Sequence, residues 1–161
     1  MKRDTILIFE DNAIERNILA ELFRSDYKIL EASNGKEGLE LLNRNFSSVA
    51  VVLLDYLMPE MNGFEVLSCL RKKNIMNKIP FIMITGQESA EFEKRGYEYG
   101  IVSYIKKPYQ PDVIRQVVSN ATGWFQYKMQ LEAVVKKQNE NIKKQNDILR
   151  QQARKLNQLN E

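Results

Sequence analysis

Five short apolar runs alternate along the chain with segments whose apolar residues recur at helical spacing. Their length and their β-branched and aromatic content predict strands at TILIF (5–9), YKILEA (27–32), SVAVVLL (48–54), PFIMIT (80–85) and VSYIK (102–106). Helices are predicted over 12–24, 35–45, 63–73 and 89–99, the first of them from the spacing of Ile14, Ile18, Leu19 and Leu22. A fifth helix is expected after Pro111, because proline suits the first turn of a helix.

The runs at 48–54 and 80–85 are apolar at nearly every position. Strands that are buried on both faces have this composition, and they occur in parallel sheets that are covered by helices on each side. The order of the elements therefore predicts an α/β fold with a five-stranded, doubly wound parallel sheet. Such sheets place their functional sites at the carboxyl ends of the strands.

Polar side chains lie at these predicted strand ends, and they are Glu10, Asp11, Asp55, Thr85, Lys106 and Lys107. Asp11 and Asp55 would stand on neighbouring strands, where two carboxylates about 4 Å apart repel each other by about 4 kcal/mol in a partly screened site. A cation is therefore expected between them. The chain has no histidine, and its one cysteine lies in a predicted helix. A ligand set of oxygen atoms alone indicates Mg²⁺ or a similar hard ion.

A lysine and a hydroxyl group beside such a metal would complete a site for a doubly charged anion. Carboxylate, metal and lysine are together what phosphoryl transfer to an aspartate requires, since the cations neutralise the phosphoryl oxygens while the carboxylate attacks in line. Each acid taken alone has another interpretation, because Asp11 or Asn12 could cap a helix and Asp55 could begin a turn. The presence of the whole set at the strand ends favours the functional interpretation.

Four segments together resemble the receiver domain of bacterial two-component response regulators, and they are FEDN (9–12), LLDYLMPEMNG (53–63), IMITG (82–86) and YIKKP (104–108). The resemblance covers residues 3–121 and implies a flavodoxin-like strand order. It also implies that Asp55 is the phosphoacceptor. The Mg²⁺ ligands that it implies are Glu10, Asp11, Asp55 and the backbone carbonyl of Leu57.

The same resemblance assigns the remaining parts of the site. Lys107 matches the lysine of the family, and Thr85 matches the hydroxyl residue that turns toward the phosphoryl group. The backbone at Leu57 and Gly86 is expected to bind phosphoryl oxygens. Tyr104 matches the aromatic residue that moves inward when the threonine moves, so Thr85 and Tyr104 form the expected switch.

The phosphoryl group has to come from another molecule, because a chain without histidine carries no phosphohistidine. The expected donor is a histidine kinase or a phosphotransfer protein in trans, or a small phosphodonor. The chain would not be an enzyme in the wider sense, since it would catalyse only its own phosphorylation and dephosphorylation. Leu57 offers no polar group to a hydrolytic water, whereas Gln87 could, and obstruction by Leu57 predicts slow self-hydrolysis.

Two alternative functions stay open. The first is an Mg²⁺-dependent phosphohydrolase with an aspartyl nucleophile, which Leu57 disfavours because it stands where such an enzyme needs a second acid. The second is a coiled-coil adaptor that no longer signals. The presence of Asp55, Thr85 and Lys107 disfavours it.

After Gly123 the composition shifts to Gln, Asn, Lys and Glu, without proline. In a heptad frame, position a holds Val135, Ile142, Leu149 and Leu156. Position d holds Leu131, Gln138, Gln145, Gln152 and Leu159. This pattern predicts a parallel homodimeric coiled coil through residues 124–161.

The heptad frame extends backward into the predicted fifth helix, as far as Ile114. One helix that continues from Pro111 is therefore expected, although Gly123 costs about 1 kcal/mol in a helix interior. A break at 122–123 is the competing prediction, because glycine often ends helices. The predicted domains are a receiver domain over 1–121 and a signalling helix over 122–161.

Charge separates these two parts. Residues 1–123 carry 16 Lys+Arg and 17 Asp+Glu, whereas residues 124–161 carry 8 and 4, so the tail supplies the positive net charge. The basic residues lie at outer heptad positions, which is typical of a solvated face, and nucleic-acid binding is not expected. No segment has the pattern of a membrane span or a signal peptide, and the single Cys69 is expected to be a buried thiol, so a cytoplasmic location is expected. No output domain is recognised, so either partners read the receiver and the coil or the chain is a fragment.

Overall fold

The computed structural model describes residues 2–87 and 89–159. Its elements are β1 (Thr5–Phe9), α1 (Ala13–Phe23), β2 (Lys28–Ala32), α2 (Gly35–Asn45), β3 (Val49–Asp55), α3 (Gly63–Arg71), β4 (Phe81–Thr85), α4 (Ala90–Tyr99), β5 (Ser103–Lys106) and α5 (Pro111–Leu159). The predicted alternation is confirmed, and predicted and observed bounds of β1–β5 and α1–α4 differ by at most two residues. The chain divides into two compact units, 1–125 and 126–161.

The five strands form one parallel sheet in the order β2-β1-β3-β4-β5. The chain moves from β1 outward to β2, and then returns past β1 to β3. This reversal lies between β1 and β3, where the register pairs Phe9 with Leu54. A ligand site in a doubly wound sheet lies beyond the carboxyl ends of the strands at such a reversal. The predicted doubly wound sheet and its flavodoxin-like order are confirmed.

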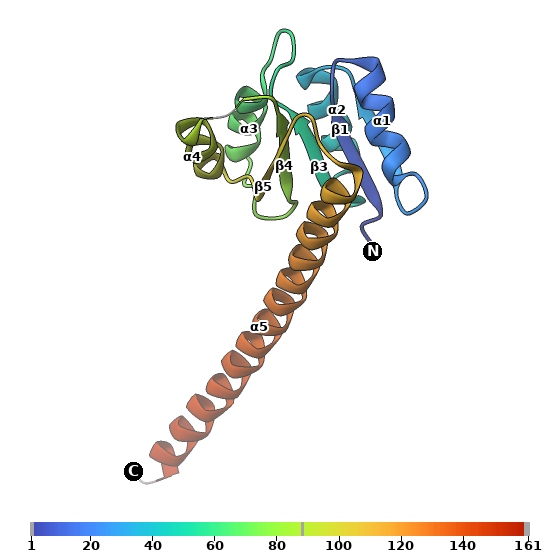
Figure 1. Ribbon diagram of the computed structural model, residues 1–161. Helices are drawn as coiled ribbons and strands as arrows, with labels where there is room; N and C mark the ends of the chain where they lie inside the picture. The colour runs from blue at the N-terminus through green and yellow to red at the C-terminus, as the bar shows by residue number, and fades with distance from the viewer. Residues whose placement is uncertain (1, 88, 160–161) are drawn as a thin grey trace. The chain divides into compact units, whose positions relative to one another are not determined.

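Helices lie on both sides of the sheet (Figure 1), and the core has one layer of side chains on each face. Alternate side chains of β3 point to opposite faces, so that Val52 and Leu54 join the first layer while Val51 and Leu53 join the second. The first layer contains side chains of α2, α3 and α4, and the second contains side chains of α1 and α5. Because both faces are covered, all seven residues of β3 are buried.

Only some of the apolar residues whose spacing predicted helix α1 are buried in the structure. Leu19 is buried against the sheet, together with Ala20 and Phe23. Ile14 and Ile18 lie on the other side of α1 and are 74% and 48% exposed. In α3, Cys69 is only partly buried, so the prediction of a buried thiol was wrong. The buried residues of α3 lie on the side of the helix that faces the sheet, and Cys69 lies at the border of that side, where it is partly open to solvent.

Helix α5 continues through the predicted alternative break at 122–123 and ends at Leu159. A Cβ atom at Gly123 would meet nothing within 4 Å, so no close packing requires glycine there. Continuity is confirmed, and the competing prediction of a break is wrong. Within the second unit, all described side chains from Leu131 onward are exposed. Among the described residues, every helix is too short or too polar to cross a bilayer.

Candidate functional site

Three carboxylates meet at the carboxyl ends of β1 and β3. Glu10 and Asp11 directly follow β1, and Asp55 is the last residue of β3. One oxygen of each lies within 4.8 Å of the others. Glu10 and Asp55 are buried, whereas Asp11 is exposed. Three convergent oxygen donors, one of them open to solvent, fit a hard divalent cation such as Mg²⁺.

Glu10 is the most deeply buried acid of this cluster, with 1% exposure. One carboxylate oxygen accepts the backbone N–H of Asn12 at 3.1 Å, and the other accepts the Lys107 ammonium at 3.0 Å. Burial raises the pKa of Glu10 to about 7, and these hydrogen bonds oppose the shift only in part. An incoming cation would favour the ionised form of this acid.

Asp55 shares the same environment. Burial raises the pKa of its carboxyl group above the ordinary value, and the charge and hydrogen bond of Lys107 oppose this shift. Its Oδ1 atom lies 3.5 Å from Lys107 Nζ. The strand register pairs Asp55 with Ile84, so Thr85 ends the neighbouring strand one residue further along.

Lys107 follows β5 and connects the acids of the site. Its Nζ atom lies 3.0 Å from Glu10 Oε2, 2.5 Å from Glu15 Oε2 and 3.5 Å from Asp55 Oδ1. Burial by itself lowers the pKa of the ammonium group, but hydrogen bonds to Glu15 and Glu10 outweigh it, and the net shift is upward. Lys107 therefore stays protonated and supplies a fixed positive charge beside Asp55. By contrast, Lys106 ends β5 as an exposed side chain.

The hydroxyl of Thr85 lies at the end of β4. The Thr85 side chain is buried, and its Oγ1 atom accepts the backbone N–H of Gln87 at 3.0 Å. Gly86 follows in the same loop, where a Cβ atom would meet nothing within 4 Å. Leu57 lies in the loop after β3, and its side chain is 60% exposed.

Tyr104 lies on β5 and packs against α4. Its hydroxyl donates a hydrogen bond to the carbonyl of Phe92 at 2.9 Å, and its ring makes an edge contact with Tyr97. Burial raises the pKa of Tyr104 to about 12. A Cβ atom at Gly96 would overlap the Tyr104 hydroxyl, so this close approach requires glycine. Through these contacts Tyr104 links β5, the edge strand of the sheet, to α4.

Two residues near the predicted set have roles that the sequence did not indicate. Glu15 binds Lys107, and Arg16 donates from Nη1 to the backbone carbonyl of Glu10 at 2.8 Å. Both lie in the first turns of α1, which begins just after the acidic pair. The N-cap pattern at Asn12 could have located this helix start, but the contact of Glu15 with Lys107 joins residues that are 92 positions apart in the sequence.

Residues 6–119 match the family model described as the response regulator receiver domain. The chain is 35% identical to histidine kinase P4 of Formosa agariphila over 119 residues, which are 74% of this chain. The chain is also 35% identical to the transcriptional regulatory protein SrrA of Staphylococcus aureus over 118 residues, which are 73% of this chain. The chain spans 8% of the kinase and 46% of SrrA, so it matches only part of each.

Solved structures show the same fold. The receiver domain of the Francisella response regulator 1452 is 27% identical, with a TM-score of 0.69 over 74% of this chain and 97% of that one. A response regulator receiver domain protein from Clostridium thermocellum is 25% identical, with a TM-score of 0.69 over 80% of this chain and 98% of that one.

Proposed function

Because this chain belongs to the response regulator receiver family, we propose that it is a phosphoacceptor that takes a phosphoryl group on Asp55. The donor would be the phosphohistidine of a histidine kinase or phosphotransfer protein, or a small phosphodonor. The observation that carries the proposal is the convergence of Glu10, Asp11 and Asp55 beside the Lys107 ammonium. The whole arrangement is stronger support for phosphoryl transfer to Asp55 than any one of these residues would be alone.

In the proposed reaction, a carboxylate oxygen of Asp55 attacks the phosphorus atom of the phosphohistidine. The new O–P bond forms as the P–N bond breaks, and the electron pair of that bond returns to the imidazole nitrogen of the donor. Lys107 would neutralise charge on the phosphoryl oxygens, and the Thr85 hydroxyl would hydrogen-bond to one of them. Bound Mg²⁺ would neutralise further charge, held by Glu10, Asp11, Asp55 and the Leu57 carbonyl.

The proposed response of the protein starts at Thr85. If its hydroxyl turns toward the phosphoryl group, it gives up the N–H of Gln87 that it accepts at 3.0 Å. Tyr104, on the strand beside β4, would then change its packing against α4. The surface formed by α4, β5 and α5 would carry the signal to a partner, or to an output domain outside these residues.

Incubation with acetyl phosphate and Mg²⁺ tests the proposal. The wild type should acquire one phosphoryl group by intact mass, and Asp55→Asn should acquire none. Chelation of Mg²⁺ should abolish the modification. Continuous release of phosphate without a labelled protein would instead support an aspartyl phosphohydrolase. No modification and no turnover would support an adaptor without phosphoryl chemistry.

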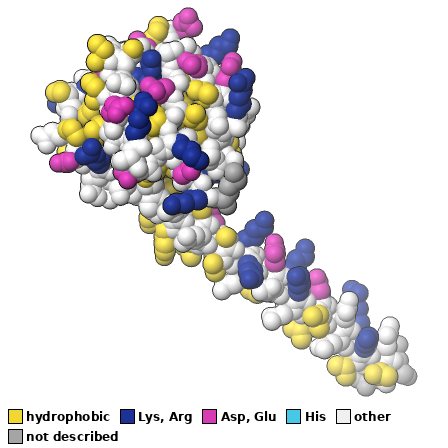
Figure 2. All heavy atoms as spheres, turned by 90° about the vertical axis from the view of Figure 1, so that its right-hand side faces the viewer, with side chains coloured by type: hydrophobic (Ala, Val, Ile, Leu, Met, Phe, Trp, Pro, Cys, Tyr) yellow, Lys and Arg dark blue, Asp and Glu magenta, His cyan; other side chains and the backbone are white. Residues whose placement is uncertain are grey.

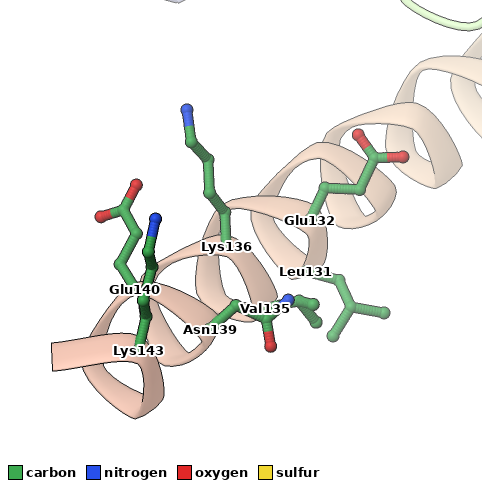
Figure 3. Close-up of a pocket in the computed structure, with 7 residues that line it drawn as sticks. All are labelled: Leu131, Glu132, Val135, Lys136, Asn139, Glu140 and Lys143. Carbon is green, nitrogen blue, oxygen red and sulfur yellow. The ribbon is translucent and has the colours of Figure 1, made fainter. Parts of the chain in front are cut away.

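For the second unit we propose a parallel homodimer through residues 124–161. Its described part presents exposed apolar side chains along one side and Lys and Arg side chains along another (Figure 2). Leu131 and Val135 line an open groove on this helix, with Asn139 beside them (Figure 3). A continuous line of apolar side chains along one side of a helix is normally buried against a partner, so a second copy of the same helix is the simplest partner for these side chains.

The heptad layers favour the parallel arrangement. In a parallel pair in register, Ile142 meets Ile142 and Gln145 meets Gln145, so apolar and amide layers each meet their own kind. In an antiparallel pair, the apolar a layers would face the glutamine d layers, and the amides would lie against apolar groups. Light scattering should give twice the chain mass, and Ile142→Glu should give the single mass. A domain boundary at 121/122, a cytoplasmic location and the absence of a nucleic-acid partner remain parts of this proposal.

A further inference from the structure

The ammonium of Lys107 lies closer to an acid of α1 than to Asp55. Its separation from Glu15 Oε2 is 2.5 Å, whereas its separation from Asp55 Oδ1 is 3.5 Å. Glu10 takes a second ammonium hydrogen at 3.0 Å. The Glu15 side chain is 41% exposed, so it is the most accessible of the three acidic side chains that contact Lys107.

Glu15 is available for this contact because its usual partner is occupied. The start of α3 has the same Asn-x-x-Glu pattern as the start of α1, and there Glu65 reaches back to the backbone N–H of its cap residue Asn62 at 2.7 Å. At α1 the cap side chain of Asn12 accepts from Glu15 N at 3.1 Å, but the Asn12 N–H donates to Glu10 instead. The Glu15 carboxylate is thereby released from the capping box and reaches Lys107.

We infer that Glu15 is a positioning residue that holds the Lys107 ammonium on the α1 side of the site and competes with the phosphoryl group of Asp55 for it. The inference rests on the proposed function. Phosphorylation places new anionic oxygens on Asp55, and Lys107 has to turn toward them. It then gives up its shortest contact, and the Glu15 carboxylate is left near a second anion.

The direction of the effect follows from charge. Glu15 stabilises the state in which Lys107 lies away from Asp55, and it also repels an anionic donor that enters the site. Both effects slow phosphorylation and weaken binding of a phosphoryl mimic. The pKa of Lys107 is consistent with this contact, because burial lowers it and the hydrogen bond with Glu15 is the largest opposing influence.

Glu15→Gln removes the charge and keeps the size of the side chain. With acetyl phosphate and Mg²⁺, the modification of Asp55 should be roughly three- to tenfold faster than in the wild type, because one partly screened carboxylate no longer opposes it. The matched control is Glu40→Gln, which removes an exposed acid of α2 that does not contact Lys107. Its rate should equal that of the wild type. Circular dichroism melts establish that both variants fold.

A second variant separates the contact from the charge. Glu15→Asp keeps the charge but is one methylene shorter, so it should reach Lys107 poorly and react faster than the wild type. If Glu15→Asp behaves like the wild type, or if Glu40→Gln accelerates as much as Glu15→Gln, net charge explains the result and the contact does not. If the wild type is modified and Glu15→Gln is no faster, the inference alone is overturned. If no variant is modified, the proposed function fails and the inference falls with it.

Two readouts do not depend on turnover. Beryllium fluoride is a mimic of the phosphoryl group, and in the presence of Mg²⁺ it should bind Glu15→Gln roughly three- to tenfold more tightly than the wild type. A crystal structure of metal-free Glu15→Gln should show Lys107 Nζ closer to Asp55 Oδ1 than the 3.5 Å of the wild type. Unchanged affinity together with an unmoved ammonium would contradict the proposed competition.

Discussion

The buried acid at position 10 should make the metal-free protein less stable as the pH rises through neutrality. Glu10 is 1% exposed, and burial raises its pKa from 4.5 to about 7. A carboxyl group with a raised pKa binds its proton more tightly in the folded state than in the unfolded chain. Its stabilising effect is therefore complete below pH 4.5, and it is lost as the pH rises through about 7.

The magnitude follows from the size of the shift. A change from 4.5 to about 7 corresponds to about 3 kcal/mol in the free energy of unfolding, since one pKa unit is worth about 1.36 kcal/mol. Glu10→Gln imitates the protonated acid at every pH. It should match the wild type at about pH 4 and be more stable by up to about 3 kcal/mol at about pH 8.

Urea unfolding followed by pulse proteolysis measures this difference, because it reports the intact fraction of the α/β unit. Without Mg²⁺, the urea midpoint of the wild type should fall between about pH 5 and about pH 8, while that of Glu10→Gln changes less. Added Mg²⁺ should reduce the fall, because a bound cation favours the ionised carboxylate. Equal midpoint changes in both proteins would refute the assignment of this pH dependence to Glu10.

Three further perturbations test other parts of the structure. Gly96→Ala should lower the free energy of unfolding by about 1–3 kcal/mol, because its Cβ atom would displace the Tyr104 hydroxyl; a thermal melt measures this, and an unchanged melting temperature would contradict the packing. Leu57→Asn should shorten the lifetime of the phosphorylated form, because it places a polar group where a hydrolytic water can be oriented; the decay of the labelled protein measures it, and a slower decay would contradict the obstruction argument. Gln145→Leu should raise the melting temperature of the second unit by circular dichroism at 222 nm if residue 145 faces a partner, since an apolar d layer packs better than an amide layer; no change would argue against that heptad frame.

Much of the fold followed from local patterns. The unbroken apolar run of β3 required cover on both faces, and every one of its residues is buried. Because parallel strands end at a common edge, the positions of Glu10, Asp11 and Asp55 in the sequence were sufficient to place them together. The same reasoning placed Lys107 near Asp55, since β5 follows β4 in the sheet.

The side of a helix that faces the core was harder to predict. Ile14 and Ile18 have the spacing of a buried stripe, yet both are exposed because α1 packs through Leu19, Ala20 and Phe23. Helical periodicity identifies a helix, but several residues can share its apolar character, and only contact with the sheet decides which of them are buried. Gly123 posed a similar ambiguity, because a glycine can end a helix or lie within one.

The sequence by itself determined the order of the elements, the doubly wound parallel sheet and the edge at which its acids meet, because these depend on local periodicity and on where strands end. Only the tertiary structure decided which acid holds the lysine. Glu15 and Lys107 are 92 residues apart, and their contact exists because Lys107, in the loop that follows β5, reaches the start of α1 and because Glu10 occupies the backbone donor of Asn12. Contacts between side chains from distant elements depend on the distances that packing creates, and no local pattern contains that information.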